Sequence, residues 1–463
     1  MAITKRIRQY FKKIFDSIRN EKLKIGFLQA VPFWIASIIT GLLAVLYARL
    51  FAYSEKMAAE IYHGRLWLLF ICSPIFFLIA WWVVKKWAPY SRGSGIPQVI
   101  AAIDIATPKH QAKISKLLSL RIIIVKAISS CMMILGGAVV GREGPTIQIA
   151  GSVFRKINML LPEWWPKISK KNMIMTGAAS GLAAAFNTPL GGIVFAVEEL
   201  TKTHISYFKT AVFTGVIVAG LTADALAGPY LYLGYPNMNH LSHFIFIAVI
   251  PVAIVAGLGS SFMCKMMLVA LRWKKSFKAD WKTPAYVAGA AFILAAMAVF
   301  INENVLGSGK DLMTQTLFTA NKHLPWYLPI LKATGSFLSF TSGGAGGVFA
   351  PALSAGAGIG SVMASWFNET DANTNLLILA GMVAFLTGVT RTPFTSAILV
   401  LEMTDRHDII FHLMLSGMIA SFVSIIVDKH SLYEHLKHEY VHDILKEEHE
   451  QPEEQLTDQI AHA

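Results

Sequence analysis

Glu143 is the residue of this chain best suited to chemistry, because it is an acid on a glycine-rich turn inside a long apolar stretch. The turn occupies 141–145 and reads Gly-Arg-Glu-Gly-Pro. A carboxylate at membrane depth is costly to keep and usually has a function. A helix is about to begin at this turn, and the amide groups at a helix N-terminus attract anions. A glutamate in such a place can compete with a free anion for the same site.

Two other turns have the same character. The segment 93–97 reads Gly-Ser-Gly-Ile-Pro and places the Ser94 hydroxyl beside the amides that begin a helix, while 346–351 reads Gly-Gly-Val-Phe-Ala-Pro and opens another. Neither turn contains a lysine or arginine, which would hold an anion too tightly to release it. Taken alone, the turn at 93–97 fits an ordinary capped helix better than an ion site.

A second candidate acid, Glu199, ends the apolar helix expected at 191–197. Its neighbour Glu198 recurs as Glu402 in a similar later segment, which indicates a structural role for both. Glu199 is matched there by Met403, so it is the better functional candidate. Burial raises the proton affinity of a carboxylate toward neutrality, as a proton relay needs. The alternative is a solvated helix end.

Tyr433 follows the last long apolar run. Its phenol can donate a hydrogen bond to an anion without carrying charge. By itself, a tyrosine at this place is more often an interfacial residue.

The composition indicates a polytopic membrane protein. Of 463 residues, 54% are hydrophobic and 15% are charged, against about 25% charged in soluble proteins. The first 24 residues are basic and amphipathic, and predict a helix on the cytoplasmic membrane surface rather than a nucleic-acid-binding arm. The three cysteines are far apart, which predicts neither a disulfide framework nor a metal site.

Apolar runs of two lengths alternate along the chain. The runs long enough to cross a hydrocarbon core of ~30 Å lie at 25–52, 66–87, 114–140, 208–227, 242–271, 283–301 and 407–427. Shorter pieces, broken by glycine and proline, lie at 95–104, 144–158, 172–185, 189–201, 325–340, 348–366, 374–388 and 393–403. Broken helices are tolerated in a membrane where they are buried or line a cavity, so they predict an internal ion site.

An internal repeat organises these segments into two membrane halves, at 25–227 and 242–427. Proline, glycine, threonine and glutamate recur at nearly the same offsets, pairing Pro145 with Pro351, Gly177 with Gly381, Thr188 with Thr392, Pro189 with Pro393 and Glu198 with Glu402. Paired broken helices place a site where the two halves meet. A terminal helix carrying Tyr433 is expected at 428–445, followed by an acidic cytoplasmic tail at 446–463.

The three turns, taken in order and spacing, resemble the CLC family of chloride channels and chloride/proton antiporters over roughly residues 25–440. The resemblance implies an all-α membrane fold, an inverted repeat of tilted and broken helices, and a homodimer with an anion path in each subunit. It implies that Ser94, Tyr433 and the amides of Val348 and Phe349 bind the anion. It further implies that Glu143 is the external gate and Glu199 the internal proton-transfer residue.

The resemblance also predicts the activity. Antiporters of the family tend to keep the second acid, so Glu199 favours chloride/proton exchange, with a passive chloride channel as the alternative. Ser94 favours chloride, since nitrate-preferring members often have proline there and fluoride-exporting members methionine. Gln98 and Ile100 depart from some bacterial members, which have acids at those positions, but neither carries the core chemistry.

The resemblance further implies a transporter rather than an enzyme, without cofactor or metal, whose substrates are chloride and protons. We expect it in the lipid bilayer of a bacterial inner membrane, with both termini cytoplasmic and no nucleic-acid partner. A remote alternative from another class is an intramembrane hydrolase with Ser180 as nucleophile. That enzyme needs a buried histidine nearby, and His204 and His243 lie at the ends of spans.

Overall fold

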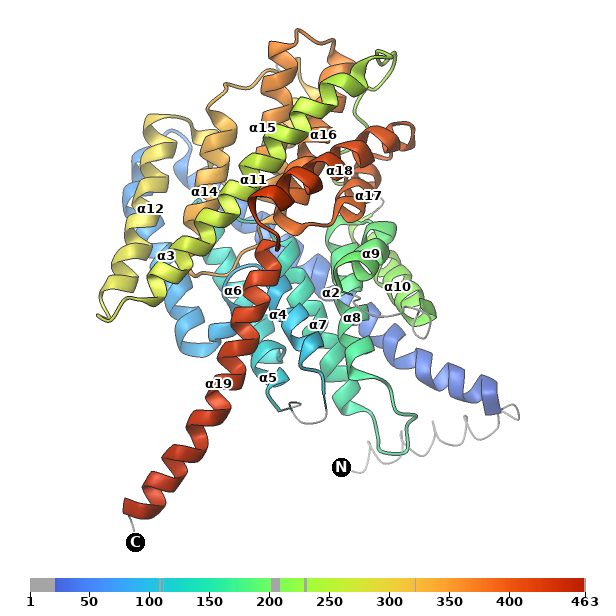
Figure 1. Cartoon of the computed structure of the whole chain (residues 1–463), viewed down its shortest axis with the longest axis vertical. Helices are drawn as coiled ribbons and strands as arrows, with labels where there is room; N and C mark the ends of the chain where they lie inside the picture. The colour runs from blue at the N-terminus through green and yellow to red at the C-terminus, as the bar shows by residue number, and fades with distance from the viewer. Residues whose placement is uncertain are drawn as a thin grey trace.

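The chain is helical almost throughout (Figure 1). The computed structural model describes residues 21–107, 110, 112–200, 209–228, 231–320 and 322–461, with side chains described in these ranges except at 21–25, 209 and 447–461. The surface helix predicted at 1–24 therefore lies almost wholly outside the described residues.

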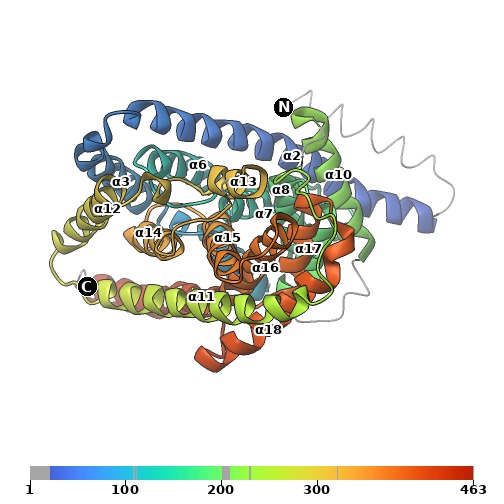
Figure 2. The same ribbon diagram turned by 90° about the horizontal axis from the view of Figure 1, so that it is seen from above.

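The helices form two successive sets. The first set comprises α2 (Glu21–Tyr62), α3 (Leu69–Trp87), α4 (Ile96–Asp104), α5 (Ile114–Leu117), α6 (Leu120–Leu135), α7 (Glu143–Leu160), α8 (Lys170–Phe186), α9 (Pro189–Phe195) and α10 (Lys209–Ala227). The second comprises α11 (Ile245–Lys275), α12 (Lys282–Phe300), α13 (Lys310–Phe318), α14 (Leu328–Ser342), α15 (Phe349–Trp366), α16 (Asp371–Thr390), α17 (Pro393–Thr404), α18 (Ile410–Val427) and α19 (Leu432–Ala461). Figure 2 shows α2 and α11 along opposite edges, with α7, α8, α15 and α16 between them.

Eight helical segments in the described part of the chain are long and apolar enough to cross a membrane. Seven coincide with the predicted long runs. The eighth is α16, Asp371–Thr390, where the sequence predicted only a short piece at 374–388. That prediction was wrong, because polar residues at 371–375 interrupt the hydropathy of a helix that is buried along its length. Protein groups replace water there, as when Lys322 Nζ donates to Asn375 Oδ1 at 2.9 Å.

The helix pair α7–α8 has its counterpart in the pair α15–α16, as the repeat predicts. Both pairs pack closely through glycine. A Cβ added at Gly177 would lie 2.9 Å from Phe154 Cβ, and one added at Gly381 would lie 2.2 Å from the Gly356 carbonyl oxygen. Small residues let helix backbones approach in a membrane, so the repeated glycines mark equivalent helix crossings.

The two halves are inverted relative to each other. The turns before α7 and α15 meet in an antiparallel bridge between Gly141 and Gly347. From that meeting point α15 and α16 fill the upper part of Figure 1, whereas α7 and α8 lie below. Equivalent helices thus extend to opposite sides of a shared centre, which confirms the predicted inverted repeat.

The repeated acids Glu198 and Glu402 join the halves to each other. Glu402, on α17, accepts hydrogen bonds from the amides of Leu190 and Gly191 at the start of α9, at 3.0 and 2.6 Å. Glu198, just after α9, accepts from the amides of Phe394 and Thr395 at the start of α17, at 3.2 and 2.7 Å. Each carboxylate satisfies orphan donors of the other half. Both acids therefore have the structural role expected from their recurrence.

The terminal helix α19 begins at Leu432 and projects from the body of the molecule (Figure 1). The sequence placed the boundary between helix and tail at 445, but α19 continues to Ala461. The start of α19 packs against α4 and α16, which brings Tyr433 into the interior.

Candidate anion site

The three glycine-rich turns meet at one buried junction. The Gly93 amide donates to the Gly344 carbonyl at 2.8 Å, and the Gly346 amide donates back to the Gly93 carbonyl at 3.0 Å. Gly141 and Gly347 exchange two further bonds, at 2.8 and 2.7 Å. These bonds tie the starts of α4, α7 and α15 into a single unit.

The junction gathers the N-termini of three helices. The first intrahelical bonds run from Val99 to Gly95 in α4, from Thr146 to Arg142 in α7, and from Ala352 to Val348 in α15. The amides that precede these donors lie in the first turns, where no helical acceptor exists. Partial positive charge at the three N-termini therefore converges on the junction, and Arg142 at the start of α7 is the one basic side chain within the turns.

Glycine is required in two places for the turns to approach so closely. Gly95 has φ +104°, a conformation that other residues rarely adopt. A Cβ added at Gly144 would lie 2.2 Å from the Ser94 hydroxyl oxygen. The close packing of these turns fixes Ser94 against the start of α7.

Ser94 and Tyr433 present two hydroxyls to the junction. Their side chains are 1% and 0% exposed. The two hydroxyls lie close enough to interact with each other, but neither forms a well-directed hydrogen bond with a described residue. The Tyr433 ring stacks on Phe349, with ring centroids 6.3 Å apart and an 8° interplanar angle, which holds the phenol at the start of α15.

Buried hydroxyls without partners cost about 1–3 kcal/mol each. An acceptor that carries no donor of its own and takes hydrogen bonds from both groups removes that cost. A halide ion has this property, so the donor set fits an anion. Ser94, Phe349 and Tyr433 are thus brought together as predicted, with Val348 in the turn beside them.

Glu143 is 1% exposed at the first turn of α7. Its carboxylate folds back on the turn, because a Cβ added at Gly141 would lie 2.3 Å from Oε2 and 3.3 Å from the Ala350 amide nitrogen. Oε2 has no hydrogen-bond partner among the described residues. The acid therefore sits beside the start of α15, where the amides of the anion site lie.

Tyr232 is a partner of Glu143 that sequence reasoning missed. Its hydroxyl donates to Glu143 Oε1 at 3.2 Å. Its ring packs on Phe186 with centroids 5.1 Å apart, and Lys310 Nζ lies 4.7 Å from the ring centroid. Tyr232 lies in the connection after α10, and no local motif marks it. Only the fold reveals this contact.

Lys126 is a second residue that the sequence did not reveal. It is buried on α6, and its Nζ donates to the carbonyls of Ser91 and Gly93 at 2.9 and 2.7 Å. The lysine thus anchors the turn that presents Ser94. Gln98 supports the same turn, because its Nε2 donates to the Arg92 carbonyl at 2.7 Å.

Glu199 lies in a half-buried turn of π-helix at Ala196–Leu200. Its neighbour Glu198 faces α17, so the two adjacent carboxylates serve different elements, as expected on a helix. Both Glu143 and Glu199 act electrostatically on the Tyr433 hydroxyl. The two acids therefore lie within range of the same buried donor.

Charged side chains of both signs lie near the Glu143 carboxylate. Arg142 and Lys310 are both electrostatic neighbours of its carboxylate. Glu55 belongs to the same group, and its Oε1 accepts from the Ser308 amide at 2.9 Å. The result is a mixed charged rim next to a junction lined by neutral donors.

A family model described as voltage gated chloride channel matches residues 75–425. The matched range includes all three glycine-rich turns. The chain belongs to this family. Among curated relatives, the H(+)/Cl(-) exchange transporter ClcA of Citrobacter koseri is 27% identical over 418 residues, covering 86% of each protein.

Solved structures of the voltage gated chloride channel family share the fold. A slow cyanobacterial Cl⁻/H⁺ antiporter matches with a TM-score of 0.78 at 21% identity, over 89% of this chain and 98% of that one. A CLC-type fluoride/proton antiporter matches with a TM-score of 0.73 at 18% identity, over 90% and 98%. These likenesses confirm the predicted all-α fold of broken, inverted helices.

Proposed function

We propose that this protein exchanges chloride for protons across a membrane. The observation that carries the proposal is the meeting of a buried acid, Glu143, with two buried hydroxyls that have no partner among the described residues. Relatives named as chloride/proton exchangers support the same activity. The second acid, Glu199, is what an exchanger needs and a passive channel does not.

Chloride binds at the junction of the three turns. The Ser94 and Tyr433 hydroxyls donate to it from one side, and the amides of Val348 and Phe349 donate from the start of α15. These groups are neutral, so they stabilise the ion through dipoles without trapping it. No resident cofactor enters this scheme, and chloride is the bound substrate.

Glu143 gates the outer end of this site. As a carboxylate it occupies an anion position near the start of α15 and blocks the path. Protonation removes its charge, so that chloride takes its place. Proton and chloride movements are coupled because the same group of backbone amides cannot bind the Glu143 carboxylate and a chloride ion at the same time. The Tyr232 hydroxyl holds the carboxylate when chloride is elsewhere.

Glu199 transfers protons to Glu143 from the cytoplasmic side of the protein. Its charge acts on the Tyr433 hydroxyl, as that of Glu143 does, which supports a proton route that passes the anion site. A proton and a chloride thus reach the centre by separate inner approaches and share only the outer end. This division gives opposite movement of the two ions.

Flux measurements on purified protein in liposomes test the proposal against a passive channel. A chloride gradient is imposed without a proton gradient, and the two ions are recorded together. An exchanger drives protons against their electrochemical gradient, and a protonophore abolishes that signal. A reversal potential that stays at the chloride value under a pH gradient contradicts exchange and favours the channel.

The assembly and location of the protein follow from the same family. We propose a homodimer in which each subunit carries its own anion path, embedded in a bacterial inner membrane with both chain ends on the cytoplasmic side. Basic loops such as 109–121 and 272–282 support that orientation, because cytoplasmic loops are enriched in lysine and arginine. Crosslinking in native membranes and labelling of terminal tags test these two points.

A further inference from the structure

A pair of adjoining cavities lies where several helices end on the face that carries α5. The first has a volume of about 660 Å³ and lies among the end of α3, α5, the start of α6 and the second half of α7. The second, of about 500 Å³, continues toward the start of α8. They share Ser115, Arg155 and Met159. We call this continuous hollow the basic cleft.

All the charged side chains that line the basic cleft are positively charged. The first cavity is lined by Lys116, Arg121, Arg155 and Lys156, and the second adds Lys170. Among the described residues, no aspartate or glutamate lines either cavity. Concentrated positive charge in a partly enclosed hollow attracts an anionic ligand more strongly than the same charges spread over a surface.

Arg155 is the fixed member of the group. It is half-buried between the two cavities, and its Nη1 donates to the Leu118 carbonyl at 2.7 Å. Arg155 forms no ion pair with a described acid. A guanidinium held by one bond keeps further N–H groups in a planar fork, which suits the oxygens of a phosphate group.

The start of α6 adds to the potential in the cleft. Ser119 caps this helix by accepting from the Ile122 amide at 3.4 Å, and both residues line the first cavity. The N-terminal end of a helix favours negative charge. A helix start and an anchored arginine are thus two independent features that favour an anion in the same hollow.

The surroundings of the cleft indicate a lipid rather than a soluble ion. The apolar side chains of Trp87, Leu120 and Met159 line it and are exposed on the outside of the molecule. Trp87 ends one candidate membrane span and Leu120 lies near the start of another, which places these two side chains at a membrane interface. A phosphate with acyl chains attached contacts both the cations and this apolar border.

We propose that the basic cleft binds the headgroup of an anionic phospholipid, with its phosphate between Arg155 and the neighbouring cations and its chains along Trp87, Leu120 and Met159. Basic pockets between membrane helices on the cytoplasmic side commonly hold such headgroups. The basic cleft contains none of the residues assigned to the anion site, and the proposal does not depend on which ion is transported.

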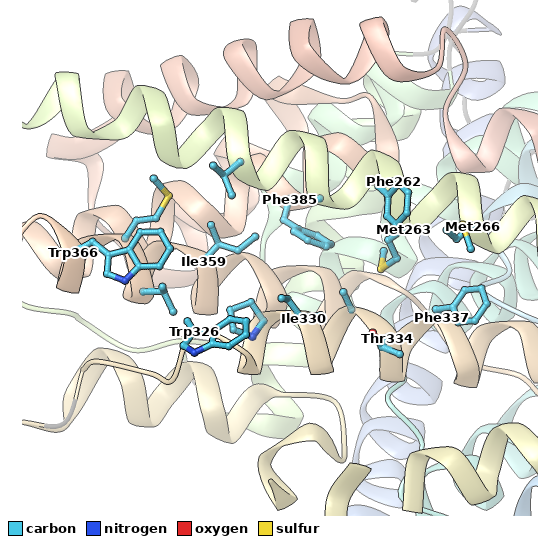
Figure 3. Close-up of a pocket in the computed structure, with 16 residues that line it drawn as sticks. Phe262, Met263, Met266, Trp326, Ile330, Thr334, Phe337, Ile359, Trp366 and Phe385 are labelled. Carbon is cyan, nitrogen blue, oxygen red and sulfur yellow. The ribbon is translucent and has the colours of Figure 1, made fainter. Parts of the chain in front are cut away.

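A second hollow in the described part of the molecule provides a contrast. An apolar groove of about 550 Å³ lies between α11, α14 and α15. Figure 3 shows Trp326, Phe337 and Trp366 among the side chains that line it. Its lining carries no charged side chain among the described residues. Any phospholipid can lay an acyl chain against such a groove, whereas only the basic cleft discriminates by headgroup charge.

Lipid titration followed by native mass spectrometry tests the proposal on the full-length protein. The probes are phosphatidylglycerol and phosphatidylcholine with the same chains, and inorganic phosphate as a separate competitor. We expect phosphatidylglycerol to bind the wild type at least tenfold more tightly. The double variant Arg121→Gln/Lys156→Gln should lose most of that preference, at about fivefold per removed cation. Within the described ranges, neither side chain forms an ion pair.

The control variant is Lys278→Gln/Lys282→Gln, which removes two exposed cations outside the cleft, one in the loop after α11 and one at the first residue of α12. It should keep the preference for phosphatidylglycerol. Equal binding of both lipids by the wild type, or equal loss in the control variant, would overturn the proposal. Displacement of phosphatidylglycerol by inorganic phosphate at similar concentration would show a soluble-phosphate site and would also contradict it.

Discussion

The two halves of this molecule share a scaffold but differ in chemistry. The turn before α7 and the turn before α15 meet at Gly141 and Gly347. Counting back two residues from Pro145 reaches Glu143, and the same step from Pro351 reaches Phe349. One half therefore presents a carboxylate where the other presents a ring that stacks on Tyr433. The residues that the two halves share form the anion site. The residue that differs between them, Glu143, is the one to which we assign gating.

The second asymmetry lies after α9 and α17. Glu198 and Glu402 occupy equivalent places and cap each other's half, whereas Glu199 stands opposite Met403, which is fully buried. Equivalent positions that keep the same residue are structural here. Equivalent positions that differ are those to which we assign transport chemistry. Substitutions at each kind of position test this contrast.

Glu143→Gln should have the largest effect. Glutamine has the shape of the protonated acid and cannot be charged, so chloride flux should continue while coupled proton movement falls to background. Simultaneous recording of both ions in liposomes measures this. Phe349→Leu, at the equivalent position of the other half, removes the ring that stacks on Tyr433 but leaves the acid in place, so it should keep proton coupling even if it changes the chloride flux. Proton-coupled exchange that persists in Glu143→Gln would remove the gate role.

Glu199→Gln should rank second. Proton movement should fall by at least tenfold, while chloride movement continues, because the anion path does not use this side chain. Met403→Leu is the matched control in the other half and should leave both fluxes unchanged. Undiminished proton transport in Glu199→Gln would place the proton route elsewhere.

Glu198→Gln and Glu402→Gln should act on stability and act alike. Each removes charge from hydrogen bonds to two amides, and hydrogen bonds to charged groups contribute about 1.5–3 kcal/mol. Thermal unfolding in detergent should show a similar loss for both variants, with the ratio of chloride to proton flux retained. A loss of coupling in only one of them would show that these acids are not structural equivalents.

Tyr232→Phe should have the smallest effect. It removes one hydrogen bond to Glu143 Oε1, with a net contribution of about 0.5–1.5 kcal/mol, and keeps the ring that packs on Phe186. Exchange should stay coupled while its rate rises by up to about tenfold, since the carboxylate leaves its position more readily. A slower rate would indicate that Tyr232 instead assists the passage of the ion.

The sequence predicted the fold well where periodicity and special residues coincide. Long apolar runs, glycine-rich turns and recurring glutamates each have a local physical signature, and they led to the helices, the repeat and the reciprocal caps. The length of α16 was not predictable from hydropathy, because its polar first turn is satisfied by protein groups such as Lys322. Burial against other helices decides such cases, and no local pattern reports it.

The sequence predicted the turns of the anion site but not the side chains that hold those turns and Glu143 in place. Ser94 and Glu143 lie in motifs that are typical of a helix N-terminus, and the structure places both residues at one junction. Tyr232 and Lys126 reach the same junction from distant segments, and their contacts depend on side-chain placement across the fold. Tyr433 is intermediate, since its position after the last span was visible but its stacking on Phe349 was not.

Crystals soaked in bromide offer the most direct test of rivalry between the acid and the halide. Anomalous scattering should place bromide within hydrogen-bonding distance of the Ser94 and Tyr433 hydroxyls and the start of α15 in the wild type. In Glu143→Gln a further bromide should occupy the place of the carboxylate beside Gly141. Bromide bound far from this junction, or an identical set of bromide positions in both proteins, would contradict the account.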